Sequence, residues 1–394
     1  MPSLFSKINP LKDLNMPTLK SLLVAASLLI TPFLALANDI PPPPSMAVKS
    51  YVLLDMNSNN FIAGNGADAR VEPASLTKVM TAYLVFKALE KGHLKADQVV
   101  PVSTYAWKAE GSRMFIEPNR PVTVEELIHG VIIQSGNDAS IALAEAVAGS
   151  EEVFVQLMNQ EAKRIGMNST NFMNATGLPD PDHYTTAHDL ALLAAALIRD
   201  HPEQYKRLYS VKEYTYNNIT QPNRNLLLWR DPHVDGIKTG HTQSAGYCLM
   251  TSAKREDTRL ISVVLGATSE NARATESQKL LNYGFQFYES HKVYKAGQAI
   301  NQIKVWKGKD NVLASTVAED LYITLPKGEY GRVKATLTSQ QPLIAPINAG
   351  QEVGTIEFTL DGKVIDTQKL VASKSVAIAG FFGRLWDTIR LWFV

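Results

Sequence analysis

Residues 72–78 read Glu-Pro-Ala-Ser-Leu-Thr-Lys and contain the only Ser-x-x-Lys sequence in the chain. A helical pattern begins at Ser75, continues to Lys91 and ends at Gly92. A three-residue step on a helix places Ser75 and Lys78 on the same side, one turn apart. A serine hydroxyl is a weak nucleophile until a neighbouring base removes its proton. Lys78 can be that base if its pKa lies well below the usual value of about 10.4.

A second polar sequence, Ser135-Gly136-Asn137, interrupts a helical region that extends from Val124 to Ala148. It follows an apolar helix, and the Gly and Asn residues disfavour continuation of that helix. Ser135 would supply a second hydroxyl as a proton relay. The Asn137 amide would hold both the lysine and a substrate carbonyl.

A third sequence, Lys238-Thr239-Gly240, occurs once, at the end of a strand expected over residues 233–239. Gly240 leaves space for a ligand backbone, and a strand edge offers N–H and C=O groups to an extended peptide. Lys238 and Thr239 would hold a carboxylate. Each sequence alone also fits an ordinary helix start or turn, but their joint presence in this order favours one shared site.

The composition is that of a folded protein whose 394 residues suit two domains, one large and one small. Lys and Arg number 39 against 38 Asp and Glu, so no excess charge favours nucleic acid as a partner. The histidines, including His183 and His188, show no metal-ligand spacing. We therefore expect no metal and no cofactor.

The N-terminus predicts export. Residues 1–37 place lysines before an apolar run and end in Ala35-Leu36-Ala37, which is the order of a signal peptide cleaved before Asn38. An uncleaved membrane helix is the alternative, but the apolar run is short and contains Pro32. Met16 is a second possible start. Residues 38–45 form a proline-rich spacer.

The sole cysteine, Cys248, excludes an intrachain disulfide. It lies in an apolar strand sequence, which favours a buried core residue over a catalytic thiol.

Residues 46–292 predict a large domain in which helices occupy the middle of the sequence and strands its two ends. This α+β pattern implies an antiparallel sheet with helices packed on it. The expected strands are 50–55, a hairpin partner at 61–63, 233–239, 246–253 and 260–267. Further helices are expected at 150–165, 186–199 and 270–288.

Residues 293–373 predict a small all-β domain, with short strands and a hairpin turn at Asp361-Gly362. Residues 374–394 predict an amphipathic helix with large apolar side chains on one face, among them Phe382, Trp386 and Trp392. Such a helix can cap a domain, but so many aromatic side chains at a free terminus favour an interfacial membrane anchor.

These sequences resemble the low-molecular-mass penicillin-binding proteins, the D-alanyl-D-alanine carboxypeptidases of Gram-negative bacteria (peptidase family S11). The resemblance covers nearly the whole chain. It is carried by residues 72–78, by Gly-Val-Ile-Ile-Gln-Ser-Gly-Asn-Asp-Ala at 130–139 and by Asp-Gly-Ile-Lys-Thr-Gly-His-Thr at 235–242. It implies a β-lactamase/transpeptidase-like domain with helices on both faces of its sheet, followed by a small β-sandwich.

The resemblance also implies roles for single residues. Ser75 would form the acyl-enzyme, and its backbone N–H and that of His241 would form the oxyanion hole. Arg273 would help to bind the terminal carboxylate of the substrate; the alternative is an arginine on a helix surface. Thr176 stands where some relatives carry a histidine, which leaves the rate of deacylation open.

The implied activity is removal of the terminal D-alanine from peptidoglycan stem peptides, with β-lactam antibiotics as covalent inhibitors. The implied location is the periplasmic face of the inner membrane, held there by the C-terminal helix. Endopeptidase action on cross-links is an alternative because it uses identical chemistry.

A β-lactamase would need a glutamate near the site, and residues 174–183 contain Asp180 and Asp182 but no Glu. A non-catalytic wall-binding protein is disfavoured because Ser75, Lys78, Ser135 and Lys238 are all intact.

Overall fold

The computed structural model describes residues 40–393, so the expected signal peptide lies outside the described residues. The first domain is built on a five-stranded antiparallel sheet in the order β2-β1-β9-β8-β7. Its strands are β1 (Ser50–Asp55), β2 (Asn60–Asn65), β7 (Val234–Thr242), β8 (Gly246–Arg255) and β9 (Thr258–Ala267). The sheet thus joins the two ends of the domain sequence, as predicted.

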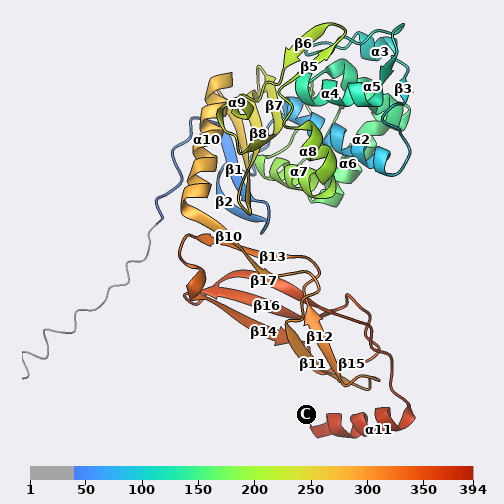
Figure 1. The fold of residues 1–394 in the computed structure, drawn as a ribbon, viewed down its shortest axis with the longest axis vertical. Helices are drawn as coiled ribbons and strands as arrows, with labels where there is room; N and C mark the ends of the chain where they lie inside the picture. The colour runs from blue at the N-terminus through green and yellow to red at the C-terminus, as the bar shows by residue number, and fades with distance from the viewer. Residues whose placement is uncertain (1–39, 394) are drawn as a thin grey trace, which may run out of the picture. The chain divides into compact units, whose positions relative to one another are not determined.

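Helices cover both faces of this sheet. Helix α10 (Glu270–Phe287) packs on β8 and β9, and α7 (Ala187–Asp200) packs on the opposite face (Figure 1). All six residues of β1 are buried, because side chains on both faces meet a helix layer.

Most of the remaining helices form an α-helical layer on the α7 side, whereas the last of them, Leu227–Arg230, contacts α10 through a hydrogen bond from Arg230 to Asn271. They are η1 (Ala74–Thr77), α2 (Lys78–Glu90), α3 (Thr104–Trp107), α4 (Val124–His129), the π-helical turn η2 (Gly130–Gln134), α5 (Asn137–Ala148), α6 (Glu151–Ile165), α8 (Pro202–Leu208) and α9 (Leu227–Arg230). Two small antiparallel sheets pair β3 (Val99–Val100) with β4 (Val122–Thr123), and β5 (Glu213–Tyr216) with β6 (Ile219–Pro222); only the second pair is a hairpin.

The C-terminal domain is all-β, as predicted, and its central sheet has the order β14-β16-β17-β12-β11-β15. Its strands are β10 (Tyr288–Tyr294), β11 (Asn301–Trp306), β12 (Val312–Thr316), β13 (Leu321–Pro326), β14 (Val333–Ser339), β15 (Leu343–Ile344), β16 (Glu352–Leu360) and β17 (Lys363–Ala372); η3 spans Tyr330–Arg332. The turn at Asp361-Gly362 has positive φ at both residues and joins β16 to β17, which confirms the predicted hairpin.

Both predicted boundaries of this domain shift by a few residues. Strand β10 begins at Tyr288 and pairs with β13, so the β domain starts before residue 293. Val376 and Ile378 form β-bridges with Ile347 and Gly308. The terminal helix α11 therefore begins at Phe381 (Phe381–Arg390) rather than at 374, and η4 (Leu391–Phe393) follows it. Among residues 40–393, no helix is long and apolar enough to cross a bilayer.

Candidate active site

Ser75 lies in the 3₁₀ turn η1, which leads directly into α2. The preceding Ala74 has φ +48°, a conformation that residues with a side chain rarely adopt. Two glycines lie so close to this turn that neither has room for a side chain. A Cβ added at Gly177 would lie 1.8 Å from the Ala74 carbonyl oxygen, and one added at Gly240 would lie 3.2 Å from the Ala74 Cβ. The serine is thus held between the 174–178 loop and strand β7.

Lys78 is 1% exposed, and its Nζ contacts three oxygen acceptors. It donates to Ser75 Oγ at 3.1 Å, to Asn137 Oδ1 at 2.6 Å and to the Thr176 carbonyl oxygen. Burial, helped by the positive charge of Arg224, lowers the pKa of Lys78 to about 7. The amine therefore lies in contact with the serine that it would deprotonate, with a pKa suited to that task.

Ser135 and Asn137 flank the break that the sequence predicted. The π-helical turn η2 ends at Gln134, and the following residue, Ser135, has a φ of +61° that turns the chain before α5 begins at Asn137. Ser135 Oγ accepts a hydrogen bond of 2.9 Å from Lys238 Nζ. The Asn137 amide group donates to the Glu110 carbonyl oxygen at 2.6 Å, while its oxygen accepts from Lys78. The break thus places a hydroxyl and an amide beside the two lysines.

Lys238 and Thr239 lie on β7, the edge strand of the five-stranded sheet, so the outer side of its backbone is not paired within that sheet. Lys238 is 4% exposed, and burial together with the charge of Lys78 lowers its pKa well below the usual value. Apart from Ser135, its Nζ bonds to the Thr239 carbonyl oxygen at 3.1 Å. The free edge of β7 can pair with an extended peptide backbone, and the Lys238 amine can donate a hydrogen bond to an acceptor in the cleft.

Arg273, from the first turn of α10, is 2% exposed. Its guanidinium donates to the carbonyl oxygens of Gly240 and Arg224, each at 3.3 Å, and lies 3.5 Å from a Glu270 carboxylate oxygen. A buried arginine fixed by backbone carbonyls is not the surface arginine of the alternative reading. It faces the same cleft as β7.

The side chains described above surround one cavity of about 200 Å³. Its lining includes six predicted residues, Ser75, Ser135, Thr239, Gly240, His241 and Arg273. The other three predicted residues, Lys78, Asn137 and Lys238, contact the lining through the hydrogen bonds given above. The structure thus brings all nine predicted residues together.

Sequence reasoning missed four lining residues, which are Ser112, Arg224, Tyr247 and Glu270. Arg224 Nη1 donates to Ser112 Oγ at 2.8 Å across a separation of 112 residues. No motif marks either residue, so only the folded chain reveals their position. Arg224 adds a second guanidinium group to the cavity wall, beside that of Arg273.

Asp138 is a supporting residue whose role the sequence did not reveal. Its buried carboxylate accepts hydrogen bonds from the backbone N–H groups of Met114, Phe115 and Ile116, at 3.0, 2.8 and 3.2 Å. It therefore ties the loop that carries Ser112 to the start of α5.

Acidic, histidine and cysteine side chains do not form a metal site anywhere in residues 40–393: no group of three or more of them is arranged to hold an ion. The chemistry of the cavity is that of hydroxyls, amines and guanidinium groups.

Comparison with known proteins gives two family matches. A model described as D-alanyl-D-alanine carboxypeptidase (Peptidase S11) matches residues 37–269, and one described as the C-terminal domain of penicillin-binding protein 5 matches residues 288–377. The second match begins where β10 begins and ends within the segment that forms β-bridges.

Similar proteins cover most of the chain. D-alanyl-D-alanine carboxypeptidase DacC from Escherichia coli is 43% identical over 93% of each chain. Penicillin-binding protein 5 from Haemophilus influenzae, a solved structure, is 42% identical with a TM-score of 0.82, covering 86% of this chain and 99% of that one. Penicillin-binding protein D2 from Listeria monocytogenes, solved in its ampicillin-bound form, is 30% identical with a TM-score of 0.58, covering 62% of this chain and all of that one.

Proposed function

The chain belongs to the D-alanyl-D-alanine carboxypeptidase family of serine peptidases, and from that premise we propose that its acyl-enzyme forms on Ser75. The activity itself, hydrolytic release of the terminal D-alanine from peptidoglycan peptides, follows from the family and from identity over nearly the full chain. The observation that supports the residue assignment is the 3.1 Å contact between Lys78 Nζ and Ser75 Oγ in a cavity bordered by β7.

Neutral Lys78 accepts the proton of Ser75 as the hydroxyl oxygen attacks the carbonyl between the two D-alanines. The backbone N–H groups of Ser75 and His241 stabilise the negative oxygen that develops, an effect typically worth a few kcal/mol. The C–N bond then breaks, the leaving amine takes a proton through Ser135, and D-alanine departs. Water later cleaves the serine ester and regenerates the hydroxyl.

The terminal carboxylate of the substrate accounts for the cations of the cavity. Lys238 and Thr239 lie on the edge strand, and Arg224 and Arg273 line the adjoining wall. An anion bound there offsets the cost of burying positive charge. β-Lactam antibiotics carry a carboxylate and a reactive amide, so we propose that they acylate the same serine. The ampicillin-bound relative supports this step.

The direct test labels the full chain with a fluorescent penicillin. Ser75→Ala should abolish the covalent label while leaving thermal unfolding unchanged. Ser58→Ala, a serine on the distant β1–β2 turn, is the control and should label normally. Retained labelling of the Ser75 variant would refute the assignment.

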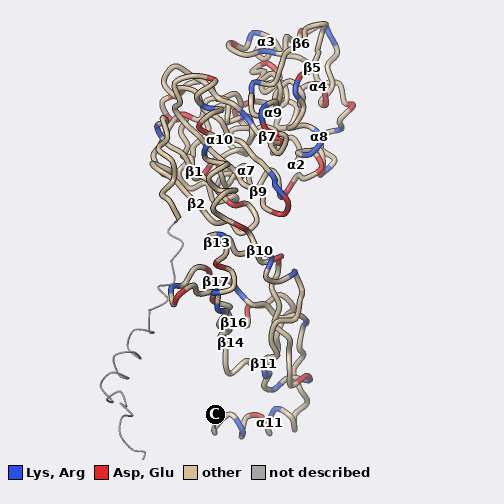
Figure 2. The backbone as a smooth tube through the Cα atoms, turned by 60° about the vertical axis from the view of Figure 1, so that its left-hand side comes forward, with Lys and Arg blue, Asp and Glu red and all other residues tan. Residues whose placement is uncertain are grey.

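We also propose that residues 1–37 direct export to the periplasm and that α11 then holds the enzyme to the inner membrane. Trp392 on η4 is 81% exposed, and helix α11 leaves Phe382 82% and Trp386 59% exposed. It also carries Arg384, Asp387 and Arg390 (Figure 2). Asp387 accepts a hydrogen bond from the Lys307 backbone N–H, so a polar residue contacts the β domain while the aromatic side chains remain in solvent.

Sedimentation with anionic phospholipid vesicles tests the anchor. The chain lacking its first 37 residues should bind, and replacing Phe382, Trp386 and Trp392 by Ala should release it without loss of penicillin labelling. Thr388→Ala, on the same helix, is the control. Equal binding of all variants would contradict the anchor, and mass analysis of exported protein would test cleavage before Asn38.

A further inference from the structure

Two backbone oxygens of the loop formed by residues 174–183 hold the start of α2. They are the carbonyl oxygens of Ala175 and Thr176, which accept hydrogen bonds from Thr81 Oγ1 at 2.7 Å and from Lys78 Nζ. These contacts are available whatever side chains the loop carries. Only a contact made by a side chain of this loop depends directly on its sequence.

His183 makes such a contact. Its imidazole Nε2 lies 3.1 Å from the hydroxyl oxygen of Thr77, the residue that immediately precedes Lys78 in the Ser-x-x-Lys sequence. Both residues are buried, His183 with 2% exposure and Thr77 with none. Thr77 is also the N-cap of α2, yet its side chain accepts no capping hydrogen bond from the helix. The Thr77 hydroxyl is therefore free to bond to the imidazole.

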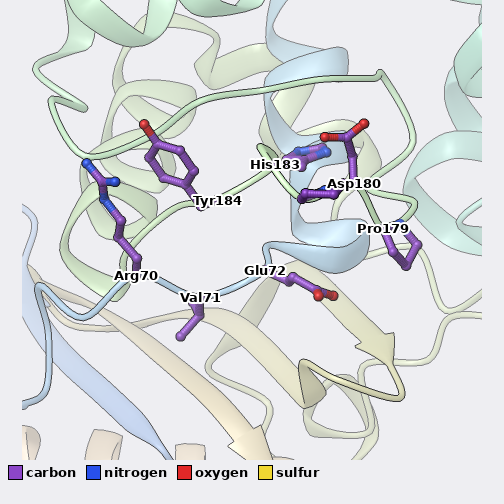
Figure 3. Close-up of a pocket in the computed structure, with 8 residues that line it drawn as sticks. Arg70, Val71, Glu72, Pro179, Asp180, His183 and Tyr184 are labelled. Carbon is purple, nitrogen blue, oxygen red and sulfur yellow. The ribbon is translucent and has the colours of Figure 1, made fainter.

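The surroundings of the imidazole leave this bond without a substitute. His183 lines a hollow of about 430 Å³ that opens between the segment Arg70–Glu72 and the part of the loop that begins at Pro179 (Figure 3). The second ring nitrogen, Nδ1, is buried and has no hydrogen-bond partner among residues 40–393. Within that range, the bond to Thr77 is thus the one hydrogen bond that the ring makes.

Burial also keeps the imidazole uncharged. It lowers the pKa of His183 to about 4, although the negative charges of Asp180 and Glu72 act in the opposite direction. The ring is therefore neutral throughout the pH range in which Lys78, with a pKa of about 7, loses its proton. It can hold the turn without placing a second positive charge beside the catalytic amine.

We propose that His183 is a positioning residue, whose hydrogen bond to Thr77 fixes the turn in which Ser75 and Lys78 face each other. A looser turn would lengthen the 3.1 Å contact between Lys78 Nζ and Ser75 Oγ, across which the proton moves. His183 itself touches none of the reacting atoms. The proposal rests on the proposed function, since it assumes that the acyl-enzyme forms on Ser75.

The test measures the first-order rate of acylation by penicillin separately from the affinity that precedes the covalent step. His183→Leu fills the site but cannot bond to Thr77, whereas His183→Gln keeps a polar group that can. The Leu variant should acylate about tenfold more slowly at unchanged affinity, and the Gln variant should regain most of that rate. Equal rates in the two variants would overturn the proposal, because packing alone would then explain the residue.

A double-mutant cycle shows whether His183 acts through Thr77. Thr77→Val removes the partner hydroxyl and should lower the acylation rate by the same factor as His183→Leu. The two substitutions together should cause no further loss, because the bond is already absent in each single variant. Losses that multiply in the double variant would overturn the proposal.

Thermal unfolding of each variant shows that the rates belong to folded protein. If His183→Leu does not fold, Thr77→Val decides alone, and a parent acylation rate in it would overturn the proposal. His188→Ala is the control: this histidine lies outside the hollow, pairs with Asp68 at 3.0 Å and should leave the rate unchanged.

Penicillin labelling of Ser75→Ala separates this proposal from the proposed function. If that variant does not label while the His183 and Thr77 variants acylate at the parent rate, the positioning role alone is refuted. If Ser75→Ala still labels, the active site on which the proposal rests is refuted as well.

Discussion

The peptidase cleft and the small β domain bury opposite kinds of side chain. Lys78, Lys238 and Arg273 are at most 4% exposed around the cleft. In the described residues 293–393, by contrast, no lysine or arginine is buried, and the core is aliphatic side chains packed around Phe358. Burying a charge is costly, whereas burying apolar surface stabilises a domain. The buried lysines and arginine of the cleft therefore serve the reaction, whereas the buried apolar residues of the β domain stabilise its fold.

The largest effect should come from replacing the buried base. Lys78→Met should slow acylation by penicillin by about 10³-fold, since general bases typically contribute 10²- to 10⁴-fold. The unfolding temperature should not fall, because removing a buried amine also removes the cost of its desolvation. Lys91→Met, an exposed lysine just after α2, is the control in both assays. A large loss of stability in Lys78→Met would show that this buried lysine also stabilises the fold.

The reverse result is expected in the β domain. Phe358→Ala, in the core of the domain, should lower the free energy of unfolding by about 3–5 kcal/mol, measured by denaturant titration. Penicillin acylation of the folded protein should be unchanged. Leu337→Ala, an exposed residue of neighbouring β14, should cost no more than about 0.5 kcal/mol. Slower acylation in Phe358→Ala would show that the two regions are not separate.

The dependence of the acylation rate on pH measures the pKa of Lys78 in the cleft. Lys78 acts in its neutral form, so the rate should rise about tenfold per pH unit below 7 and level off above the pKa of about 7. Because the positive charge of Arg224 lowers this pKa, Arg224→Gln should move the midpoint upward. Phe358→Ala should leave the midpoint in place. A midpoint near the ordinary lysine pKa would contradict the role of burial.

The same pKa predicts a trend in stability. Between pH 7 and about 10.4 the unfolded chain keeps a proton on Lys78 that the folded chain has released. The contribution of Lys78 to the free energy of unfolding therefore rises with pH across this window. Denaturant titrations of the parent and Lys78→Met at several pH values isolate it as their difference, and a difference that does not vary with pH would contradict the assignment.

The smallest effect concerns Glu270, an acidic residue in the cavity lining. Its carboxylate competes with the substrate carboxylate for Arg273, which two backbone carbonyls hold in place without it. Glu270→Gln should raise kcat/KM for peptides with a free C-terminal carboxylate by roughly two- to threefold. A peptide ending in a carboxamide is the control and should not change. A decrease would mean that Glu270 orients Arg273.

Most of the fold could be predicted from local patterns. Strand β1, the interruption before Asn137 and the turn at Asp361-Gly362 lie where the sequence placed them, because hydrophobic runs and Gly or Asn residues mark them locally. The ends of the β domain were less well placed. Strand β10 directly continues α10, and residues 376 and 378 join the domain by isolated bridges, so no change of composition marks either boundary.

The candidate site also contains residues that the sequence predicts and residues that only the folded structure reveals. Ser75, Ser135 and Lys238 belong to short motifs and were predicted; the two serines line one cavity, and Lys238 donates a hydrogen bond to Ser135. Arg224 and Ser112 reach that cavity from loops far apart in sequence, so their pairing depends on tertiary structure alone. The hydrogen bond from Lys78 to Thr176 uses a backbone carbonyl, and any side chain at that position would leave it available.

Strand β8 makes this protein a convenient background for site-specific probes. Cys248 is the only thiol of the chain, and it is buried there. Burial raises its pKa, which keeps it in the unreactive thiol form. A cysteine introduced at an exposed position of α11, such as Arg384, would be the one site that maleimide dyes or spin labels modify in the folded protein. Fluorescence of that single dye in the presence of vesicles would then test the proposed anchor, with no prior removal of native thiols.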